Sequence, residues 1–349
     1  MTVLVVRKAG RRTPEIRAGS ARWMWSTDPM IEISCAFATS MATPDHVATA
    51  EELGYRRAWL YDSPALYPDV WMILAECARR TSTIEIGPGV AVPSLRHPMV
   101  TAAAIATLVD LAPGRVNMAI GSGFTGRLTL GQKPLPWSFV REYVLALQGL
   151  LAGETVEWEG SAIRMMHPDG YGAPRPIRVP IILGVGGPKG EAVAVELADG
   201  VFATQATEGF DRSSVLCFGT VLDDGEDPGS ERAMAAAGHA AALSYHAVYL
   251  RGGVTSLPDG DRWLAALEKV PERERHLALH EGHLIYANER DRAVITGETL
   301  AMFGSARSAA GWREQLSRYE EAGATEIAYQ PAGPDVAGEL RRFMDMAKA

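Results

Sequence analysis

The sequence has few cysteines, no long apolar run and no excess of positive charge, and each absence narrows what the protein can be. Its three cysteines, among 349 residues, lack the spacing of a metal site or a disulfide framework, so a reducing, cytoplasmic compartment is expected. No apolar stretch reaches the roughly 18 to 20 residues that cross a bilayer, which excludes a membrane-spanning segment. A formal net charge of −8 argues against a nucleic-acid surface.

Residues 1–29 differ in composition from the rest of the chain. This leader is rich in arginine, but it has no apolar core followed by a small-residue cleavage site, so a targeting signal is disfavoured. Met30 stands immediately before the first apolar strand pattern. We expect a disordered basic leader, or an upstream start codon with Met30 as the natural beginning, and one domain over residues 30–349.

From Met30 onward, apolar runs of strand length alternate with helical patterns. The expected strands cover residues 31–37, 57–62, 84–92, 115–120, 179–183, 200–204 and 326–330. The expected helices cover residues 43–54, 69–81, 98–111, 137–152, 190–198, 309–322 and 336–347. Repeated β-α units joined by short turns predict a parallel sheet buried on both faces, which at this length fits a (β/α)8 TIM barrel of the α/β class.

The stretch between the sixth strand and residue 306 must supply the seventh strand and an insertion. Two helical patterns, at residues 230–250 and 259–270, predict a helical insertion between strands six and seven, spanning about residues 206–280. Residues 280–286 are the best candidate for strand seven. Additions of this kind often cover an active site.

Three strands of the predicted barrel run into glycine-rich ends. Residues 84–93 and 115–123 read as buried strands that each end in glycine, where a flat ligand can lie against bare backbone. Residues 180–190 place Gly184, Gly186, Gly187 and Lys189 before a helix, which offers backbone N–H groups to an anion. Because the carboxyl ends of barrel strands build the active site, the pattern predicts a ring system on the first two ends and a phosphate on the third.

His280, Glu281 and His283 form the densest ionisable cluster of the chain. On a strand, Glu281 and His283 would share one side and could both face a pocket as a substrate-side acid or base. A zinc site is disfavoured because the spacing does not supply three ligands, so no metal is expected. A solvated surface pair remains an equal alternative.

The order of these motifs resembles the bacterial luciferase-like superfamily. The residues that carry the likeness are Gly87–Pro93, Gly121–Gly126, Gly184–Gly190, Ala198–Gly200 and Glu321–Thr325. The first two are most similar to the branch that uses the deazaflavin coenzyme F420, including methylene-tetrahydromethanopterin reductase. The resemblance implies a barrel with an insertion, a ring that lies across strands three and four, and a non-proline cis peptide at Gly89–Val90.

The resemblance also implies roles for single residues. Asp62 matches an aspartate that contacts the ring, although relatives carry a histidine where Ser63 stands, and the alternative is that Asp62 caps a helix. Phe124 stands where some relatives have an acid. The predicted cofactor-binding residues are Asp62, Gly89, Val90, Gly121, Ser122, Gly184, Gly186, Gly187 and Lys189, and the predicted catalytic residues are Asp62, Glu281 and His283.

The activity that the resemblance implies is hydride transfer between coenzyme F420 and a small organic substrate. Two alternatives stay open, an FMNH2-dependent monooxygenase and a barrel that has lost its cofactor and serves as a binding subunit. Family members commonly dimerise, so a homodimer is expected.

Overall fold

The computed structural model describes residues 31–349, and the predicted basic leader lies outside them. Eight parallel strands form one sheet in the order β3-β2-β1-β12-β9-β8-β7-β4. Bridges Ile86–Val116 and Ala91–Ile120 join the two edges, so the sheet closes into the predicted barrel. The barrel strands are β1 (Glu32–Phe37), β2 (Arg57–Leu60), β3 (Glu85–Pro88), β4 (Met118–Gly121), β7 (Ile181–Gly184), β8 (Gly200–Ala203), β9 (Ser213–Phe218) and β12 (Glu326–Gln330).

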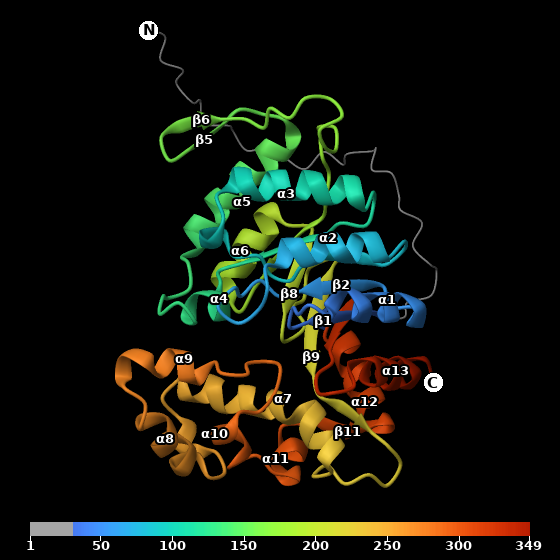
Figure 1. The fold of residues 1–349 in the computed structure, drawn as a ribbon, viewed down its shortest axis with the longest axis vertical. Coiled ribbons are helices and arrows are strands. Elements are labelled where there is room, and N and C mark those ends of the chain that lie inside the picture. Colours follow the sequence, from blue (N-terminus) through green and yellow to red (C-terminus); the bar gives the residue numbers. More distant parts are fainter. Residues whose placement is uncertain (1–30) are drawn as a thin grey trace. The chain divides into compact units, whose positions relative to one another are not determined.

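Helices cover the outside of the strands (Figure 1). They are α1 (Thr43–Leu53), α2 (Val70–Arg80), α3 (Pro98–Leu111), α5 (Trp137–Ala152), α6 (Pro188–Leu197), α12 (Ala309–Glu321) and α13 (Val336–Lys348). The short α4 (Phe124–Leu128) lies instead in the loop after β4, at the carboxyl end of the barrel. Proline at an N1-like position begins α1, α3 and α6, where a missing N–H does no harm. The (β/α)8 fold predicted from the sequence is confirmed.

The interior of the barrel is filled by side chains from alternate positions of the strands. Trp59 and Phe202 meet there edge to face, with ring centroids 5.4 Å apart. Ala36, Ala119, Ile182 and Ala328 complete this inner cluster from the other strands. The inside is therefore a packed core, so a ligand must bind at an end of the barrel.

A buried ionic network closes the amino-terminal end of the barrel. Glu326, 2% exposed, pairs with Arg57 (Oε2 to Nη1, 2.7 Å) and accepts hydrogen bonds from Trp59 Nε1 (3.0 Å) and Ser214 Oγ (2.6 Å). Burial pushes the pKa of Glu326 upward, but Arg57 and Arg212 outweigh it and hold the pKa at about 2. This network lies away from the strand ends that form active sites and serves stability.

The predicted position of strand seven is wrong. The seventh barrel strand is β9, Ser213–Phe218, and residues 204–212 join it to β8 without a helix. The predicted strand at residues 280–286 is a series of turns, because Gly282 and Leu284 take left-handed φ angles of 71° and 61° that no strand accepts. The helical insertion therefore lies between strands seven and eight, one strand later than predicted.

The insertion leaves the barrel at β10 (Thr220–Leu222) and returns at β11 (Ala306–Ser308), and these two strands pair. Between them lie α7 (Glu231–Tyr249), α8 (Gly260–Glu268), α9 (Arg275–Leu279), α10 (Glu289–Arg292) and α11 (Gly297–Met302), which Figure 1 shows as one group. The predicted helices at 230–250 and 259–270 match α7 and α8. Tyr245 and Trp263 centre a separate hydrophobic core here.

A short antiparallel hairpin, β5 (Val156–Trp158) and β6 (Ser161–Ile163), follows α5 and was not predicted. Within residues 31–349, no helix combines the length and the apolar character that crossing a bilayer requires.

Candidate active site

Val90 is the centre of a glycine-lined bed at the carboxyl ends of three neighbouring barrel strands. The Gly89–Val90 peptide bond is cis, as the resemblance to the luciferase-like superfamily implies. A Cβ added at Gly121 would lie 2.7 Å from Val90 Cγ2, and one added at Gly184 would lie 2.8 Å from Val90 Cγ1. Val90 therefore rests on bare backbone from β4 and β7, and the structure brings together Gly89, Val90, Gly121 and Gly184.

Replacing Gly121 by alanine is expected to destabilise the protein by about 1–3 kcal/mol, because the added methyl must push Val90 aside. Chemical denaturation measures this loss, and a Gly121→Ala, Val90→Ala double variant should recover part of it. Gly186→Ala is the matched control, since nothing lies within 4 Å of a Cβ at that position. Equal losses for Gly121→Ala and Gly186→Ala would contradict the packing argument.

Asp62 lies beside this bed as a buried carboxyl group. It lies two residues after the end of β2 and is 9% exposed. Its side chain accepts a 3.4 Å hydrogen bond from the Val92 N–H. Burial raises its pKa to about 6, although the Val92 N–H and Arg96 oppose the shift. The capping alternative for Asp62 is wrong, because Asp69 caps α2 by accepting from the Trp71 and Met72 N–H groups.

The loop after β4 carries two further predicted positions. Ser122 is half-buried, and its carbonyl accepts a 2.8 Å hydrogen bond from the Leu135 N–H. Phe124 is 57% exposed and begins α4. Because Phe124 has no carboxyl group, the acidic side chain near this loop is Asp62, which lies in the loop after β2. Gly126 stands between the two loops, since its Cβ would lie 3.1 Å from the Asp62 carbonyl oxygen.

The turn after β7 has the form expected of an anion site. Gly187 is the N-cap of α6 and has no side-chain cap, while Gly186 and Lys189 are exposed. A Cβ at either glycine would meet nothing within 4 Å, so open space surrounds this turn. Among the described residues, no backbone carbonyl accepts from the Gly186 or Gly187 N–H. These donors and the helix start fit a phosphate group.

Residues 280–286, here called the mouth segment, tie the insertion to the carboxyl end of the barrel. Tyr67 Oη donates to the His283 carbonyl (2.7 Å), and Gln330 Nε2 donates to the Leu284 carbonyl (2.8 Å). The Leu284 side chain packs against the inner barrel cluster. His283 Nε2 lies 3.4 Å from Thr125 Oγ1, in the loop after β4. The mouth segment therefore contacts loops from both sides of the barrel.

The two predicted residues of this segment have different environments. His283 is buried, and burial lowers its pKa well below the usual range, with His246 and His280 adding to the shift. Its ring stacks on His246, which pairs with Asp291 at 3.3 Å. Glu281 is exposed, so the structure does not bring it together with His283. The shared side assumed for them depended on a strand that does not form.

The fold and the glycine bed agree with comparisons to known proteins. A model of the luciferase-like monooxygenase family matches residues 36–216, more than half of the chain. The chain belongs to this family. The matched stretch includes Asp62, the Val90 bed and the turn at Gly186.

Curated relatives of this luciferase-like protein include 5,10-methylenetetrahydromethanopterin reductase of Archaeoglobus fulgidus, 32% identical over 161 residues (45% of this chain, 47% of the relative). An F420-dependent glucose-6-phosphate dehydrogenase of Microbacterium testaceum is 30% identical over 177 residues (47% and 52%). The chain thus matches these relatives over about half of their length. The solved coenzyme F420 dependent tetrahydromethanopterin reductase of Methanopyrus kandleri superposes with a TM-score of 0.61 at 19% identity, covering 90% of this chain and 98% of that one, which confirms the fold.

Sequence reasoning about this luciferase-like protein missed several residues at the barrel mouth. Tyr67, Thr125 and Gln330 contact the mouth segment, and His246 packs behind it. One signal was available for Gln330, which follows the inward-facing Ala328 by two residues on the last strand. The histidine contacts had no such signal, since they arise only when the insertion packs on the barrel.

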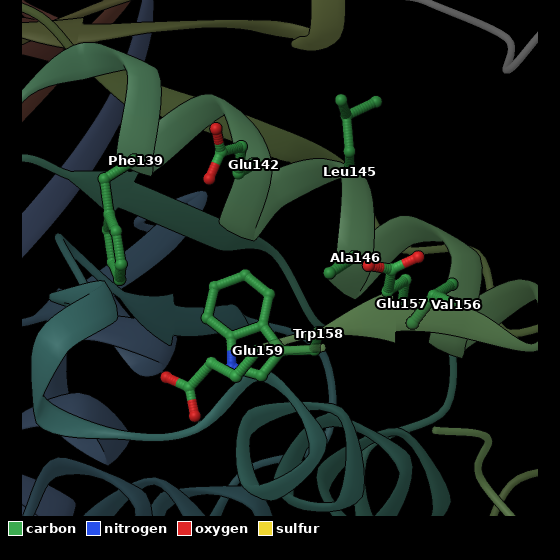
Figure 2. A pocket seen from close by; sticks show the side chains of 8 residues that line it. All are labelled: Phe139, Glu142, Leu145, Ala146, Val156, Glu157, Trp158 and Glu159. Carbon is green, nitrogen blue, oxygen red and sulfur yellow. The ribbon is translucent and has the colours of Figure 1, made fainter. Parts of the chain in front are cut away.

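A surface hollow of about 570 Å³ lies elsewhere on the luciferase-like barrel, between α5 and the β5–β6 hairpin. Figure 2 shows Phe139 and Trp158 in its wall beside the carboxylates of Glu142 and Glu159. None of the predicted site residues lines it. It is therefore separate from the candidate active site.

Proposed function

We propose that the protein is a coenzyme F420-dependent oxidoreductase that moves a hydride between the deazaflavin and a small organic substrate. The observation that carries this proposal is the bed that Val90 forms on Gly121 and Gly184, within the stretch matched by the family model. The relative named as an F420-dependent glucose-6-phosphate dehydrogenase supports the choice of cofactor.

The residues present fit such a cofactor. A flat ring system needs a surface without long side chains. Gly121 and Gly184 let the Val90 side chain lie close against the backbone, so the ring would rest on the compact Val90 side chain and not directly on the glycines. The N–H groups of Gly186 and Gly187 and the charge of Lys189 would hold a phosphate at the start of α6. When bound, the deazaflavin supplies hydride exchange, and the protein contributes position and surroundings.

The proton that accompanies hydride transfer needs a group that can bind and release it near neutral pH. The Asp62 carboxyl, with a pKa of about 6, lies beside the bed and suits this role. His283 reaches Thr125 from the other side and stays neutral, so its ring can donate or accept a hydrogen bond. The mouth segment contacts the same end of the barrel and would limit the access of water to a bound ligand.

An FMN-dependent monooxygenase is the second candidate, because the matching family model describes luciferase-like monooxygenases. The same bed would receive the FMN ring, so the two proposals differ in the cofactor that the protein selects. A cofactor-free binding subunit is disfavoured, since the three glycine-rich strand ends are all in place.

A titration of the purified protein with oxidised coenzyme F420 and, separately, with FMN tests the proposal by fluorescence quenching. We expect saturable binding of coenzyme F420 with at least about tenfold selectivity over FMN, a free-energy difference of about 1.4 kcal/mol. Tighter binding of FMN than of coenzyme F420 would instead support the FMN-dependent monooxygenase. Binding of neither would return it to the cofactor-free alternative.

A further inference from the structure

Three deeply buried side chains at the carboxyl end of the barrel leave polar atoms without a protein partner. They are the Tyr61 hydroxyl, the Gln330 Oε1 oxygen and both ring nitrogens of His239. Their residues are 6%, 0% and 2% exposed, respectively. Within residues 31–349 none of these atoms has a hydrogen-bond partner, which is unfavourable for a folded protein unless something else binds them.

Tyr61 and Gln330 point toward the barrel axis. Tyr61 follows Trp59 by two residues, and both side chains belong to the inner barrel cluster. Gln330 follows Ala328, which is in the same cluster, by two residues on β12. Because side chains alternate along a strand, both residues face the mouth of the barrel from its carboxyl end.

His239 approaches the same place from the insertion. Its ring lies edge-on to Phe218, the last residue of β9, with centroids 6.5 Å apart. The neighbouring turn of α7 packs over the loop after β12, since a Cβ at Gly333 would lie 3.1 Å from the Ala236 Cα. His239 therefore lies above the ends of β9 and β12.

Gln330 and His239 lie across the mouth from the glycine bed, and Tyr61 lies next to the bed, because β2 pairs with β3. In the closed barrel, β9, β12, β1 and β2 are consecutive, and they carry or underlie His239, Gln330 and Tyr61. The remaining arc includes β3, β4 and β7, which carry Val90, Gly121 and Gly184. The bed thus takes one arc of the mouth, and Tyr61, Gln330 and His239, here called the polar wall, take the arc that begins at the next strand, β2.

The wall is uncharged at neutral pH. Burial raises the pKa of the Tyr61 hydroxyl well above its usual range. Burial lowers the pKa of His239 to about 4, although the nearby Ala236 backbone opposes this shift. Gln330 uses its amide N–H groups on Leu284 and Pro331, so its oxygen is free to accept a hydrogen bond from a ligand.

We infer that Tyr61, His239 and Gln330 bind the substrate, and that the substrate presents an uncharged hydroxyl or carbonyl group to them. This inference rests on the proposed function and adds the substrate class. The three residues offer donors and acceptors but no positive charge, so a phosphate or carboxylate placed there would lose its hydration without an ion pair. An alcohol or a ketone matches the wall. Oxidation of the alcohol would pass its carbon-bound hydride to the bound deazaflavin and its hydroxyl proton to the Asp62 carboxylate, and reduction of the ketone would reverse both transfers.

The test uses full-length protein and probe pairs that differ in charge. The pairs are 2-butanol with lactate and glucose with glucose 6-phosphate, each measured by reduction of bound coenzyme F420 under nitrogen and by the shift in melting temperature. We expect the uncharged member of at least one pair to engage the protein at least 10-fold more tightly than its charged partner.

Two variants test the wall itself. Tyr61→Phe and His239→Leu should lower kcat/KM, or probe affinity, by about 5- to 100-fold, because each removes a hydrogen bond made only to the ligand. Neither should lower the melting temperature without ligand or weaken binding of coenzyme F420. Tyr55→Phe is the matched control, because the buried Tyr55 hydroxyl donates to the Leu340 carbonyl (2.8 Å). It should lose stability and keep its activity.

Preference for a charged probe, failure of every uncharged probe, or unchanged kinetics and affinity in both wall variants would overturn the inference. A Tyr61→Phe variant that loses as much stability as Tyr55→Phe would do so as well, because the hydroxyl would then have a structural partner. If coenzyme F420 does not bind at all, the proposed function fails, and the melting shifts with the same probes still decide whether the wall binds uncharged ligands.

Discussion

Replacing Asp62 by asparagine is expected to lower turnover by about 10²- to 10⁴-fold, the range typical for loss of a general acid or base. The amide keeps the shape of the carboxyl group and can still accept from the Val92 N–H, so the fold and the glycine bed should persist. In the direction of alcohol oxidation the carboxylate is the active form, so wild-type turnover should rise as pH increases through about 6. This inflection should be absent from the variant.

The same substitution is expected to raise stability at neutral pH. Because the folded-state pKa of Asp62 lies above its ordinary value of 3.8, the folded protein holds the proton more tightly than the unfolded chain. Wild-type stability therefore falls as pH rises from about 4 through 6, and asparagine does not incur this loss. The gain at pH 7 should reach at most about 3 kcal/mol and vanish below pH 4.

Urea denaturation of both proteins at several pH values, together with steady-state kinetics, measures these effects. Asp335→Asn is the matched control, because Asp335 caps α13 and asparagine caps a helix equally well. It should change neither property. An Asp62→Asn variant that is less stable and fully active would give Asp62 a purely structural role.

Replacing Glu326 by alanine should have the largest effect on stability. The change removes one of the two carboxylates that lie 2.7 Å from the buried Arg57, the other being Glu85, and it removes the acceptor of Trp59 and Ser214. Breaking such a buried pair typically costs about 3–5 kcal/mol, which equilibrium unfolding in urea would show directly. Removing the exposed Glu314, which pairs with Arg318 on one helix face, should change stability by less than about 0.5 kcal/mol.

The advantage of the wild type over Glu326→Ala should depend on pH. The folded-state pKa of about 2 lies below the ordinary value of 4.5, so the ionised carboxylate stabilises the fold above pH 4.5. This contribution should be lost as pH falls from about 4.5 toward 2. A difference between the two proteins that stays constant over this range would mean that packing, and not charge, accounts for the loss.

The sequence predicted the barrel because its strands are short apolar runs bounded by turn residues. Residues 57–62 and 326–330 show this pattern and match β2 and β12. The seventh strand escaped because Ser213 and Ser214 weaken its apolar pattern, and because both serines bond groups that are distant in sequence. The Ser213 N–H donates to Thr325 Oγ1, and Ser214 Oγ donates to Glu326.

The candidate site also has one part that could be predicted from the sequence and one part that could not. The glycines around Val90 could be predicted because close backbone approach requires a specific residue type at a strand end. The environments of His239 and His283 could not, since they depend on how the insertion packs on the barrel. The apparent alternation over residues 280–286 was misleading because Gly282 lets the chain turn where a strand would continue.

The insertion has a hydrophobic core of its own and joins the barrel through the adjacent, paired strands β10 and β11. Such an attachment makes it a cassette that can be exchanged at two neighbouring points without cutting any barrel strand. A chimaera that receives a different cassette between residues 222 and 306 would keep the glycine bed and acquire new groups in place of His239 and His283. Such an exchange would replace the part of the proposed substrate wall that His239 supplies, while Tyr61, Gln330 and the glycine bed would stay with the barrel.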